Sequence, residues 1–545
     1  MKRRNFIKLA STTSALGLLP FELKALLKTI DLDVVDCGDV SNRKLVLVNL
    51  VGGNDGLNTT IPINGYDTYA NLRPTVRIPD AGSSRFIKLD TTLADEQQLG
   101  LHPALTGFKS LYDEGQLRIL QAVGYPSQNK SHFASKDIYS TGNDGNNWLN
   151  GKSSGWTGRF MEKFYTEELE AAYPLGVQIG SSKTELGFHG AEEHGLSINI
   201  TGQDPAGFFT EISGLGGEAP TNIPMSHFGD ELKYIIDVNK TSNKFSKSIS
   251  DAFNNGTNAA TYEDNNLSNQ LKTVARLISG GLQSKVYLVS IGGFDTHNNQ
   301  IQGQADIKGK HYDLLSEVSS AVTTFVKDLN EQSLGDDVVG LTYSEFGRKA
   351  KENGNFGTDH GEIAPMFVFG KPVNGGVSGT NVDLSEATSD NNYQLETIQF
   401  DYRQTITTLL QDFLGASDTV IDHTFFNYST NESFVNAKIE RVIKSSYSIS
   451  KGCIADPAEN INPEIKKNWF VYPNPFTTQL NLNSLKEFTG VYYKLYDNSG
   501  KLVTHGSKEV VNNGVLIEVP KLPSGLYFLQ IESGGRTESH KVFRL

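Results

Sequence analysis

The stretch LVLVNLVGGNDGLN at residues 45–58 decides the fold. Its first half is an apolar run interrupted only by Asn49, and two glycines and an Asn-Asp pair follow at once. Such a run is typical of a strand that is buried on both faces of a parallel sheet. The glycine pair allows the backbone to turn sharply where the strand ends. We therefore expect Asp55 at the carboxyl end of a buried strand.

Several other segments repeat this pattern and alternate with helical patterns. Apolar runs recur at 117–123, 286–291, 338–341 and 366–369, and helical periodicity lies at 103–112, 267–278, 312–329 and 402–414. Strands that alternate with helices in this way are typical of a sheet with helices on its faces. The fold class that we expect is α/β, with a mostly parallel sheet flanked by helices.

Acidic side chains follow three of these strands. Asp55 follows the first, Asp295 stands in the motif GGFDTHN, and Glu345 stands in the motif YSEFGR. The polar loop NGNFGTDHG adds Asp359 and His360 just before the last strand. Sites in such sheets form beyond the carboxyl ends of the strands, so we expect these side chains to gather at one edge.

Carboxylates gathered at one edge repel one another, and a divalent cation offsets that repulsion. Asp, Glu and His are ligands for zinc, manganese, magnesium and calcium, so one or two such ions are the expected cofactor. The alternative is that Asp55 and Asp295 each cap a following turn. The expected ligands are Asp55, Asp295, His297, Glu345 and His360.

Composition argues against some partners and sites. The formal net charge of −13 argues against nucleic acid and anionic membranes. The two cysteines, Cys37 and Cys453, do not form a Cys-x-x-Cys pattern, which argues against a zinc-thiolate site. They stand at the two ends of the middle region, and they either form a disulfide after export or are unrelated thiols.

The N-terminus, MKRRNFIKLASTTSALGLLP, joins paired arginines to an apolar run that is too short to span a bilayer. This pattern indicates a twin-arginine secretory signal at 1–30, with the twin-arginine translocase as a partner and the periplasm as the route. The alternative is a chance arginine pair at the start of a cytosolic helix.

The C-terminal segment 469–545 alternates short period-two runs with turn signals, which predicts an all-β sandwich. A polar linker at 451–468 separates it from an α/β domain at 40–450. The motifs YPNPF, LPSGLY and KVFRL resemble the type A sorting domain of type IX secretion, found in Bacteroidetes. The resemblance implies the type IX machinery as a partner and the cell surface or extracellular space as the destination. The alternative is an adhesive β-module.

The middle region carries a second resemblance. The motifs KSHFASKDIYSTG, GGFDTHNNQ, TYSEFGR, ENGNFGTDHG and APMFVFG resemble the exported family catalogued as domain of unknown function 1501, over residues 44–415. That family is in turn similar to the alkaline phosphatase superfamily, which includes sulfatases and phosphoglycerate mutases. The resemblance implies an alkaline phosphatase-like domain that holds two metal ions and uses a Ser, Thr or modified Cys nucleophile.

The resemblance also implies roles for individual residues. Ser131, at the start of a helix after the second strand, matches the nucleophile, and His360 matches a late metal ligand. Asn54, Arg348 and Asp359 would support the ligands from behind.

The sequence departs from the superfamily pattern at one metal position. Glu345 stands where an Asp is usual, and Phe346 stands where a ligand His is usual. Only Thr296 separates Asp295 from His297, where the usual spacing is wider. The centre is therefore expected to be one ligand short of the two-metal pattern.

Three functions follow from these observations. The first is an exported metal-dependent hydrolase of phosphate or sulfate esters, with a small-molecule or glycan ester as substrate. The second is a catalytically degenerate surface protein that binds a glycan or a partner on the same fold. The third is a hydrolase built on Ser131 and His132, although adjacent Ser and His side chains seldom reach each other usefully.

Overall fold

The structure is a computed structural model, and the chain divides into two compact units, Met1–Ile454 and Ala455–Leu545. The predicted twin-arginine signal, the linker at 451–468, Cys37 and Cys453 lie outside the residues that the structure describes. The described residues are 40–146, 154–180, 186–191, 196–200, 245–303, 307–425, 438–449, 469–472, 476–484, 488–497, 501–511, 514–533 and 536–544.

The first unit is built on a nine-stranded sheet in the order β13-β5-β12-β9-β1-β8-β6-β7, with β14 beside β5. β1 (Lys44–Val51) pairs in parallel with β8 (Val286–Gly292) on one side and with β9 (Val338–Tyr343) on the other. Their carboxyl ends therefore meet at one edge, and the predicted mostly parallel α/β sheet is confirmed. The other strands of this sheet are β5 (Leu117–Gly124), β6 (Gly176–Ile179), β7 (Ser197–Ile200), β12 (Ala364–Phe369), β13 (Gly376–Ser378) and β14 (Phe400–Asp401).

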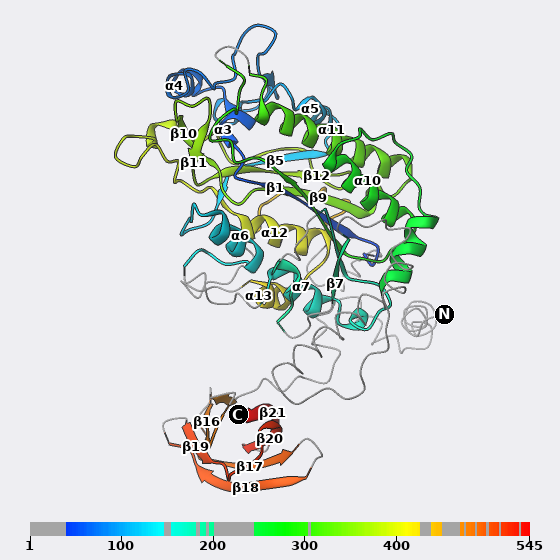
Figure 1. The fold of residues 1–545 in the computed structure, drawn as a ribbon, viewed down its shortest axis with the longest axis vertical. Helices are drawn as coiled ribbons and strands as arrows, with labels where there is room; N and C mark the ends of the chain where they lie inside the picture. The colour runs from blue at the N-terminus through cyan, green and yellow to red at the C-terminus, as the bar shows by residue number, and fades with distance from the viewer. Residues whose placement is uncertain are drawn as a thin grey trace, which may run out of the picture. The chain divides into compact units, whose positions relative to one another are not determined.

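Helices cover both faces of the sheet (Figure 1). Alternate side chains of β1 serve the two cores, because successive side chains of a strand point to opposite faces. Val46 and Val48 pack with the first group of helices, and Leu45 and Leu47 pack with the second. The first group is α5 (Thr106–Asp113), α10 (Asn266–Ser279) and α11 (Lys310–Glu331), and the second is α6 (His132–Thr141), α7 (Trp156–Phe164), α12 (Tyr402–Thr408) and α13 (Asp418–Thr424).

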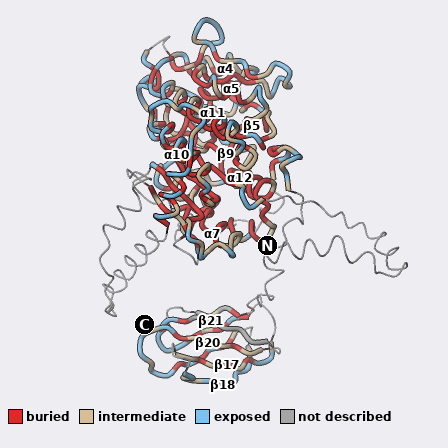
Figure 2. Tube along the Cα trace, turned by 90° about the vertical axis from the view of Figure 1, so that its right-hand side faces the viewer, coloured by how far each residue is buried: buried red, intermediate tan, exposed pale blue. Residues whose placement is uncertain are grey.

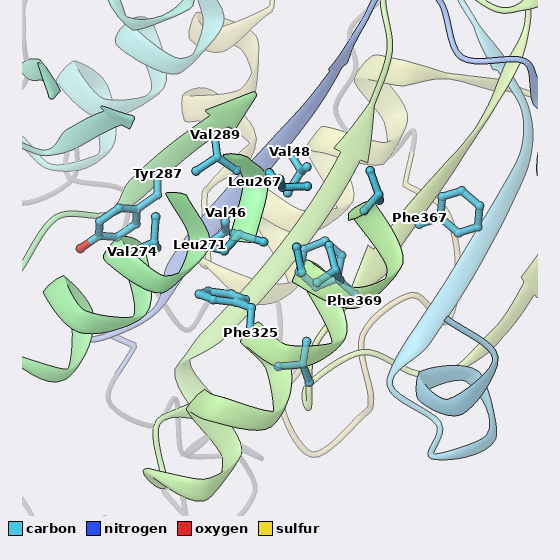
Figure 3. Close-up of a cluster of buried hydrophobic side chains, with 14 of the residues drawn as sticks. Val46, Val48, Leu267, Leu271, Val274, Tyr287, Val289, Phe325, Phe367 and Phe369 are labelled. Carbon is cyan, nitrogen blue, oxygen red and sulfur yellow. The ribbon is translucent and has the colours of Figure 1, made fainter. Parts of the chain in front are cut away.

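The core between β1 and the first group of helices is closely packed. Figure 3 shows Val46 and Val48 beside Leu267 and Leu271 of α10 and Phe325 of α11. All five side chains are buried, as are the central strands drawn in red in Figure 2. The apolar runs in the sequence are thus strands of a sheet whose two faces are both covered by helices.

β12 is the exception to the parallel order, because it pairs antiparallel with both β5 and β9. Its first residue therefore lies at the edge where β9 ends. A short hairpin of β10 (Arg348–Glu352) and β11 (Thr358–His360) comes just before it. The hairpin brings His360 to the edge at which β1, β8 and β9 deliver their acidic side chains.

Shorter elements complete the first unit. A small sheet in the order β2-β4-β3 lies beside α3 and α4. In Figure 1, α3 and α4 lie near β10 and β11. A π-helix, Leu409–Phe413, continues α12 and completes the helical segment predicted at 402–414. The remaining bounds are α3 (Gly56–Thr59), β2 (Thr60–Pro62), α4 (Tyr66–Leu72), β3 (Ile87–Lys88), β4 (Leu99–Leu101) and the 3-10 helices Asp95–Gln97, Thr166–Glu168, Leu186–Phe188, Gly335–Asp337 and Leu384–Glu386.

The second unit consists of two antiparallel sheets, as the sequence predicted. Trp469, Phe476 and Leu529 are among the buried side chains of its core. One sheet has the order β15-β16-β19 and the other has the order β18-β17-β20-β21. Their strands are β15 (Trp469–Tyr472), β16 (Gln479–Ser484), β17 (Gly490–Asp497), β18 (Leu502–Glu509), β19 (Gly514–Glu518), β20 (Gly525–Ser533) and β21 (Arg536–Arg544).

In the part of the chain that the structure describes, no helix has both the length and the apolar character needed to cross a bilayer.

Candidate metal centre

Asp295 is the focus of a polar cluster beyond the end of β8. Its Oδ1 lies 2.8 Å from His297 Nδ1, 3.1 Å from His360 Nε2 and 2.7 Å from Arg348 Nη2. Its Oδ2 lies 3.5 Å from His132 Nε2. The carboxylate is 45% exposed, so it is open to solvent and to ligands. The structure thus brings Asp295, His297, Arg348 and His360 together.

Two imidazoles face this carboxylate with the same nitrogen. The Nδ1 of His132 lies 2.9 Å from Glu345 Oε1, and the Nδ1 of His360 lies 2.8 Å from the Lys130 carbonyl oxygen. Each Nδ1 therefore carries the proton that it donates to an acceptor behind it. In the neutral rings, the two Nε2 lone pairs then point toward Asp295, which is itself an acceptor.

One ligand atom from each of His132, Asp295 and His360 lies within 4.8 Å of the others. His132 is the first residue of α6, Asp295 follows β8, and His360 ends β11. Two imidazole nitrogens and one carboxylate oxygen at this separation make a donor set that could hold a divalent metal ion. We call these three residues the His-Asp-His group.

Glu345 holds His132 and does not belong to the His-Asp-His group. Its side chain is buried, and both of its oxygens accept from the Gly52 backbone N–H, at 2.8 and 2.9 Å. Burial opposes ionisation, but the hydrogen bonds from His132 and Gly52 outweigh it and lower the pKa of Glu345. The hydrogen bond between Glu345 and His132 also raises the pKa of His132. Glu345 therefore orients the imidazole from behind, as the partner of a metal-bound histidine does.

Phe346 forms an apolar floor under two of the imidazoles. Its ring centroid lies 4.9 Å from that of His132 and 4.5 Å from that of His360, and its side chain is buried. Gly53 makes room for it, because a Cβ there would lie 2.3 Å from the Phe346 ring, and its φ of +84° also favours glycine. Phe346 thus packs against the imidazoles of His132 and His360.

Arg348 ties the surrounding loops together. Its Nε donates to the Gly53 carbonyl at 2.8 Å and its Nη1 donates to the Thr358 carbonyl at 2.9 Å. Its Nη2 donates to the Phe294 carbonyl at 3.0 Å, besides contacting Asp295. The guanidinium is buried and lies in the centre of three loops, so it fixes them relative to one another. Its positive charge also offsets the negative charge of the Asp295 carboxylate.

Asp55 does not join this cluster. It is fully buried, and its Oδ2 lies 2.7 Å from Arg73 Nη1 and 2.5 Å from Gln300 Nε2. Burial opposes ionisation, but the Arg73 charge outweighs it and lowers the pKa of Asp55. Arg73 follows α4, in a segment without any motif, and no signal in the sequence marked it as the partner. Asp55 is thus compensated by a buried cation and does not face the imidazoles.

Asn54 supports a second buried network behind the cluster. Its Oδ1 accepts from His311 Nε2 at 3.0 Å and from Thr59 Oγ1 at 3.1 Å. Its backbone N–H donates to Ser344 Oγ at 2.9 Å. Burial lowers the pKa of His311 to about 4, so this imidazole is neutral at ordinary pH. Asn54 therefore holds the strand-end loop and contacts none of the three members of the His-Asp-His group.

Ser131 and Asp359 lie at the border of the cluster. Ser131 is exposed, and as the residue before α6 it makes no side-chain hydrogen bond to cap that helix. Its neighbour His132 is held by Glu345. Asp359 contacts Lys349 at 3.4 Å and accepts from Asn353 Nδ2 at 3.1 Å.

Two family models match the chain. Residues 251–414 match the model described as "Protein of unknown function (DUF1501)". Residues 470–543 match "Secretion system C-terminal sorting domain", the sorting domain of type IX secretion. The first match is shorter than the resemblance seen in the sequence, and it includes Asp295 and His360 but not His132. No curated protein matches the chain.

Several solved structures are similar to the chain at low identity. One is a protein in the alkaline phosphatase superfamily from Vibrio parahaemolyticus, with 8% identity, a TM-score of 0.29, and coverage of 91% of this chain and 79% of that one. Another is a sulfatase from Pseudoalteromonas sp., with 11% identity, a TM-score of 0.33, and coverage of 89% and 83%. A third comes from work on glycosaminoglycan metabolism by Bacteroides thetaiotaomicron, with 9% identity, a TM-score of 0.32, and coverage of 86% and 90%.

Proposed function

We propose that the protein is an exported, metal-dependent hydrolase of phosphate or sulfate esters, with one metal ion held by His132, Asp295 and His360. The observation that carries the proposal is the orientation of the two imidazoles. Both donate Nδ1–H backwards, to Glu345 and to the Lys130 carbonyl, and both present Nε2 to Asp295. A cation between these groups would satisfy all three at once.

The donor set favours some metals over others. Imidazole nitrogen suits zinc and similar transition metals, whereas magnesium and calcium prefer all-oxygen sites. Three protein ligands leave a coordination position open, which is the pattern of catalytic zinc sites. Protonation of Nε2 on each imidazole would also join the ring to Asp295. Metal analysis of the purified protein distinguishes the protonated state from the metal-bound state.

The side chains around the group suit an anionic substrate. His132, Asp295 and His360 would hold the ion, whose charge would attract and polarise a phosphate or sulfate ester. Arg348 adds a second positive charge beside Asp295. Ser131 is exposed next to His132, and we assign it the role of nucleophile toward phosphorus or sulfur.

A second candidate function rests on the surroundings of Ser131. The neighbouring imidazole is already engaged by Glu345, and no general base is seen beside the Ser131 hydroxyl among the described residues. A protein that binds ester anions without hydrolysing them would need the His-Asp-His group but not Ser131.

Two variants of the full chain test the proposal. His360→Ala is expected to lose bound metal, measured by mass spectrometry of the elements in purified protein, because it removes one of three ligands. Ser131→Ala is expected to keep the metal and to lose turnover of aryl phosphate and aryl sulfate esters. His423→Ala is the matched control, because His423 pairs with Glu162 and lies outside the group.

The outcomes are distinct. Metal-free parent protein would refute the metal centre. Parent protein that holds metal and binds the ester anions without turnover would support the second candidate function.

We also propose that the twin-arginine signal and the sorting domain act in sequence. Deletion from residue 469 onward is expected to leave the first unit folded and held in the periplasm. Cell fractionation followed by thermal unfolding measures both points, and loss of the unfolding transition would show that the domain boundary is misplaced.

A further inference from the structure

Exposed aromatic side chains are concentrated at the proposed centre. Phe133 is 85% exposed and Phe356 is 41% exposed. They are the only exposed large hydrophobic side chains among the described residues of the first unit; the others belong to the second unit. Phenylalanine is among the residues that are most often fully buried, so an 85% exposed ring stands out.

Both phenylalanines lie close to histidines of the cluster along the chain. Phe133 directly follows His132 in the first turn of α6. Phe356 lies in the β10–β11 loop, whose next residue, Gly357, packs so closely on His297 that a Cβ would lie 2.4 Å from the His297 carbonyl. His360 links the two sides, because its ring centroid lies 4.6 Å from that of His132 and 4.6 Å from that of His297. The two phenylalanines therefore belong to segments that adjoin the His-Asp-His group.

Phe356 is also held in a conformation that phenylalanine avoids. Its φ is +55°, in the left-handed region, although Gly and Asn, which tolerate that region, surround it in the sequence. Neighbouring hydrogen bonds keep the loop in place: Gln300 N–H donates to the Phe356 carbonyl at 2.9 Å, and Asn353 N–H donates to the Gly357 carbonyl at 3.0 Å. Strain of this kind persists where a side chain has a task.

The polar side chains beside these rings indicate the kind of ligand. Asn355 is exposed beside Phe356 in the β10–β11 loop, and Asn298 and Asn299 are exposed in the loop after β8, next to His297. A carboxamide both donates and accepts, which suits neutral hydroxyl groups. Isolated rings among amides do not make the continuous apolar surface that a lipid chain needs.

We propose that Phe133 and Phe356 bind the sugar ring of a carbohydrate phosphate or sulfate ester whose anionic group enters the His-Asp-His group; this rests on the proposed function. A pyranose presents a face of C–H groups, which packs on the negative face of a phenyl ring, and hydroxyls at its edge for the amides. The two rings thus select the organic part of the ester, and the centre recognises the anion.

Binding measurements on the full chain, loaded with zinc, test this inference. The variants are Phe133→Ala, Phe356→Gly and the double variant, and the control is Phe543→Ala, which removes an exposed ring of the second unit. The probes are glucose 6-phosphate and galactose 6-sulfate, with inorganic phosphate and sulfate as reference ions without a ring. Calorimetry gives each affinity.

We expect each variant to bind the sugar esters about 3- to 10-fold more weakly and the inorganic ions within about 2-fold of the parent. Thermal unfolding is expected to be unchanged in Phe133→Ala, because that ring is exposed, and not to be lowered in Phe356→Gly, because glycine adopts the left-handed backbone without strain.

The inference would be overturned by unchanged affinity of the variants for sugar esters, by an equal loss for the inorganic ions, or by tighter binding of phenyl or hexyl esters than of sugar esters by the parent. A parent that binds the inorganic ions but not the sugar esters overturns this inference alone. A parent that binds neither overturns the proposed function, and the inference with it.

Discussion

Asp55 and Asp295 occupy equivalent places and have opposite surroundings. Each follows a pair of glycines at the end of one of two adjacent parallel strands, in which Val51 is level with Gly292. Asp55 is fully buried against Arg73, whereas Asp295 is 45% exposed and faces imidazoles. The chain after Asp55 forms α3, most of which is buried, whereas Asn298 and Asn299 after Asp295 are exposed.

The contrast shows that a carboxylate at a strand end becomes a ligand only if its partners leave it a vacant position. The guanidinium of Arg73 is permanently charged and donates directly to Oδ2, so it neutralises the charge of Asp55. Arg348 donates to Asp295 Oδ1 in the same way. Asp295 is also partly exposed and faces the Nε2 atoms of His132 and His360, so it remains available to a cation. The predictions below test this difference, beginning with the largest expected effect.

Asp55→Asn is expected to destabilise the first unit by about 3–5 kcal/mol, because it leaves the buried Arg73 charge without compensation. Chemical denaturation measures the change. The double variant Asp55→Asn with Arg73→Met is expected to recover part of the loss, because it removes the orphaned charge. A stable Asp55→Asn protein that has lost its metal would show instead that Asp55 is a ligand.

His311→Gln is expected to flatten the acid dependence of stability. The pKa of His311 is lowered from 6.5 to about 4 in the folded protein, so below pH 6.5 the unfolded chain takes up a proton that the folded chain refuses. Stability therefore falls as pH falls from 6.5 to 4, by about 3 kcal/mol in total. The glutamine variant has no imidazole to titrate, so it lacks this loss of stability between pH 6.5 and 4. Denaturation at a series of pH values compares the two, and equal slopes would contradict the assignment.

Glu345→Gln is expected to weaken metal binding by about 10- to 100-fold, because the amide holds the His132 imidazole less firmly and in less basic form. The titration is done at pH 8, where protons compete little with the metal for His132. Glu331→Gln serves as control, because Glu331 pairs with Lys327 at the surface. Equal affinities for parent and Glu345→Gln would mean that Glu345 does not orient the ligand.

Asp295→Asn is expected to change the free energy of unfolding of metal-free protein by less than about 1 kcal/mol, since its contacts are partly exposed. Arg348 keeps its backbone acceptors in this variant. The same denaturation experiment as for Asp55→Asn gives the value. A loss as large as that of Asp55→Asn would show that the two carboxylates are alike.

The sequence predicted the sheet and its helices well, because both depend on periodic burial. The strand 45–51 and the helix 267–278 are found within a residue of the predicted bounds. Asp295 and His360 could be placed at the carboxyl edge for the same reason. The antiparallel direction of β12 was not predicted, because an apolar run does not record which way it is paired.

The partners of the acidic residues could not be predicted, because they are contacts between distant segments. Arg73 lies 18 positions from Asp55 in a segment without periodicity, and His132 lies 213 positions from Glu345. His132 stood beside Ser131 in the sequence and invited a catalytic interpretation, while its ring is held by Glu345 and faces Asp295. A motif gives the position of a side chain in the sequence, but the tertiary fold determines which other side chains it contacts.

The contacts of Arg348 also set when the centre can form. Its hydrogen bond to Gly53 spans 295 positions of the chain, and that of Glu345 to Gly52 spans 293. Contacts between such distant segments form slowly, since a long loop must close before they are made. A growing chain has to reach His360 before all three ligands exist. A metal ion held by the proposed ligands would therefore have to bind after the assembly of nearly the whole first unit and could not guide its beginning.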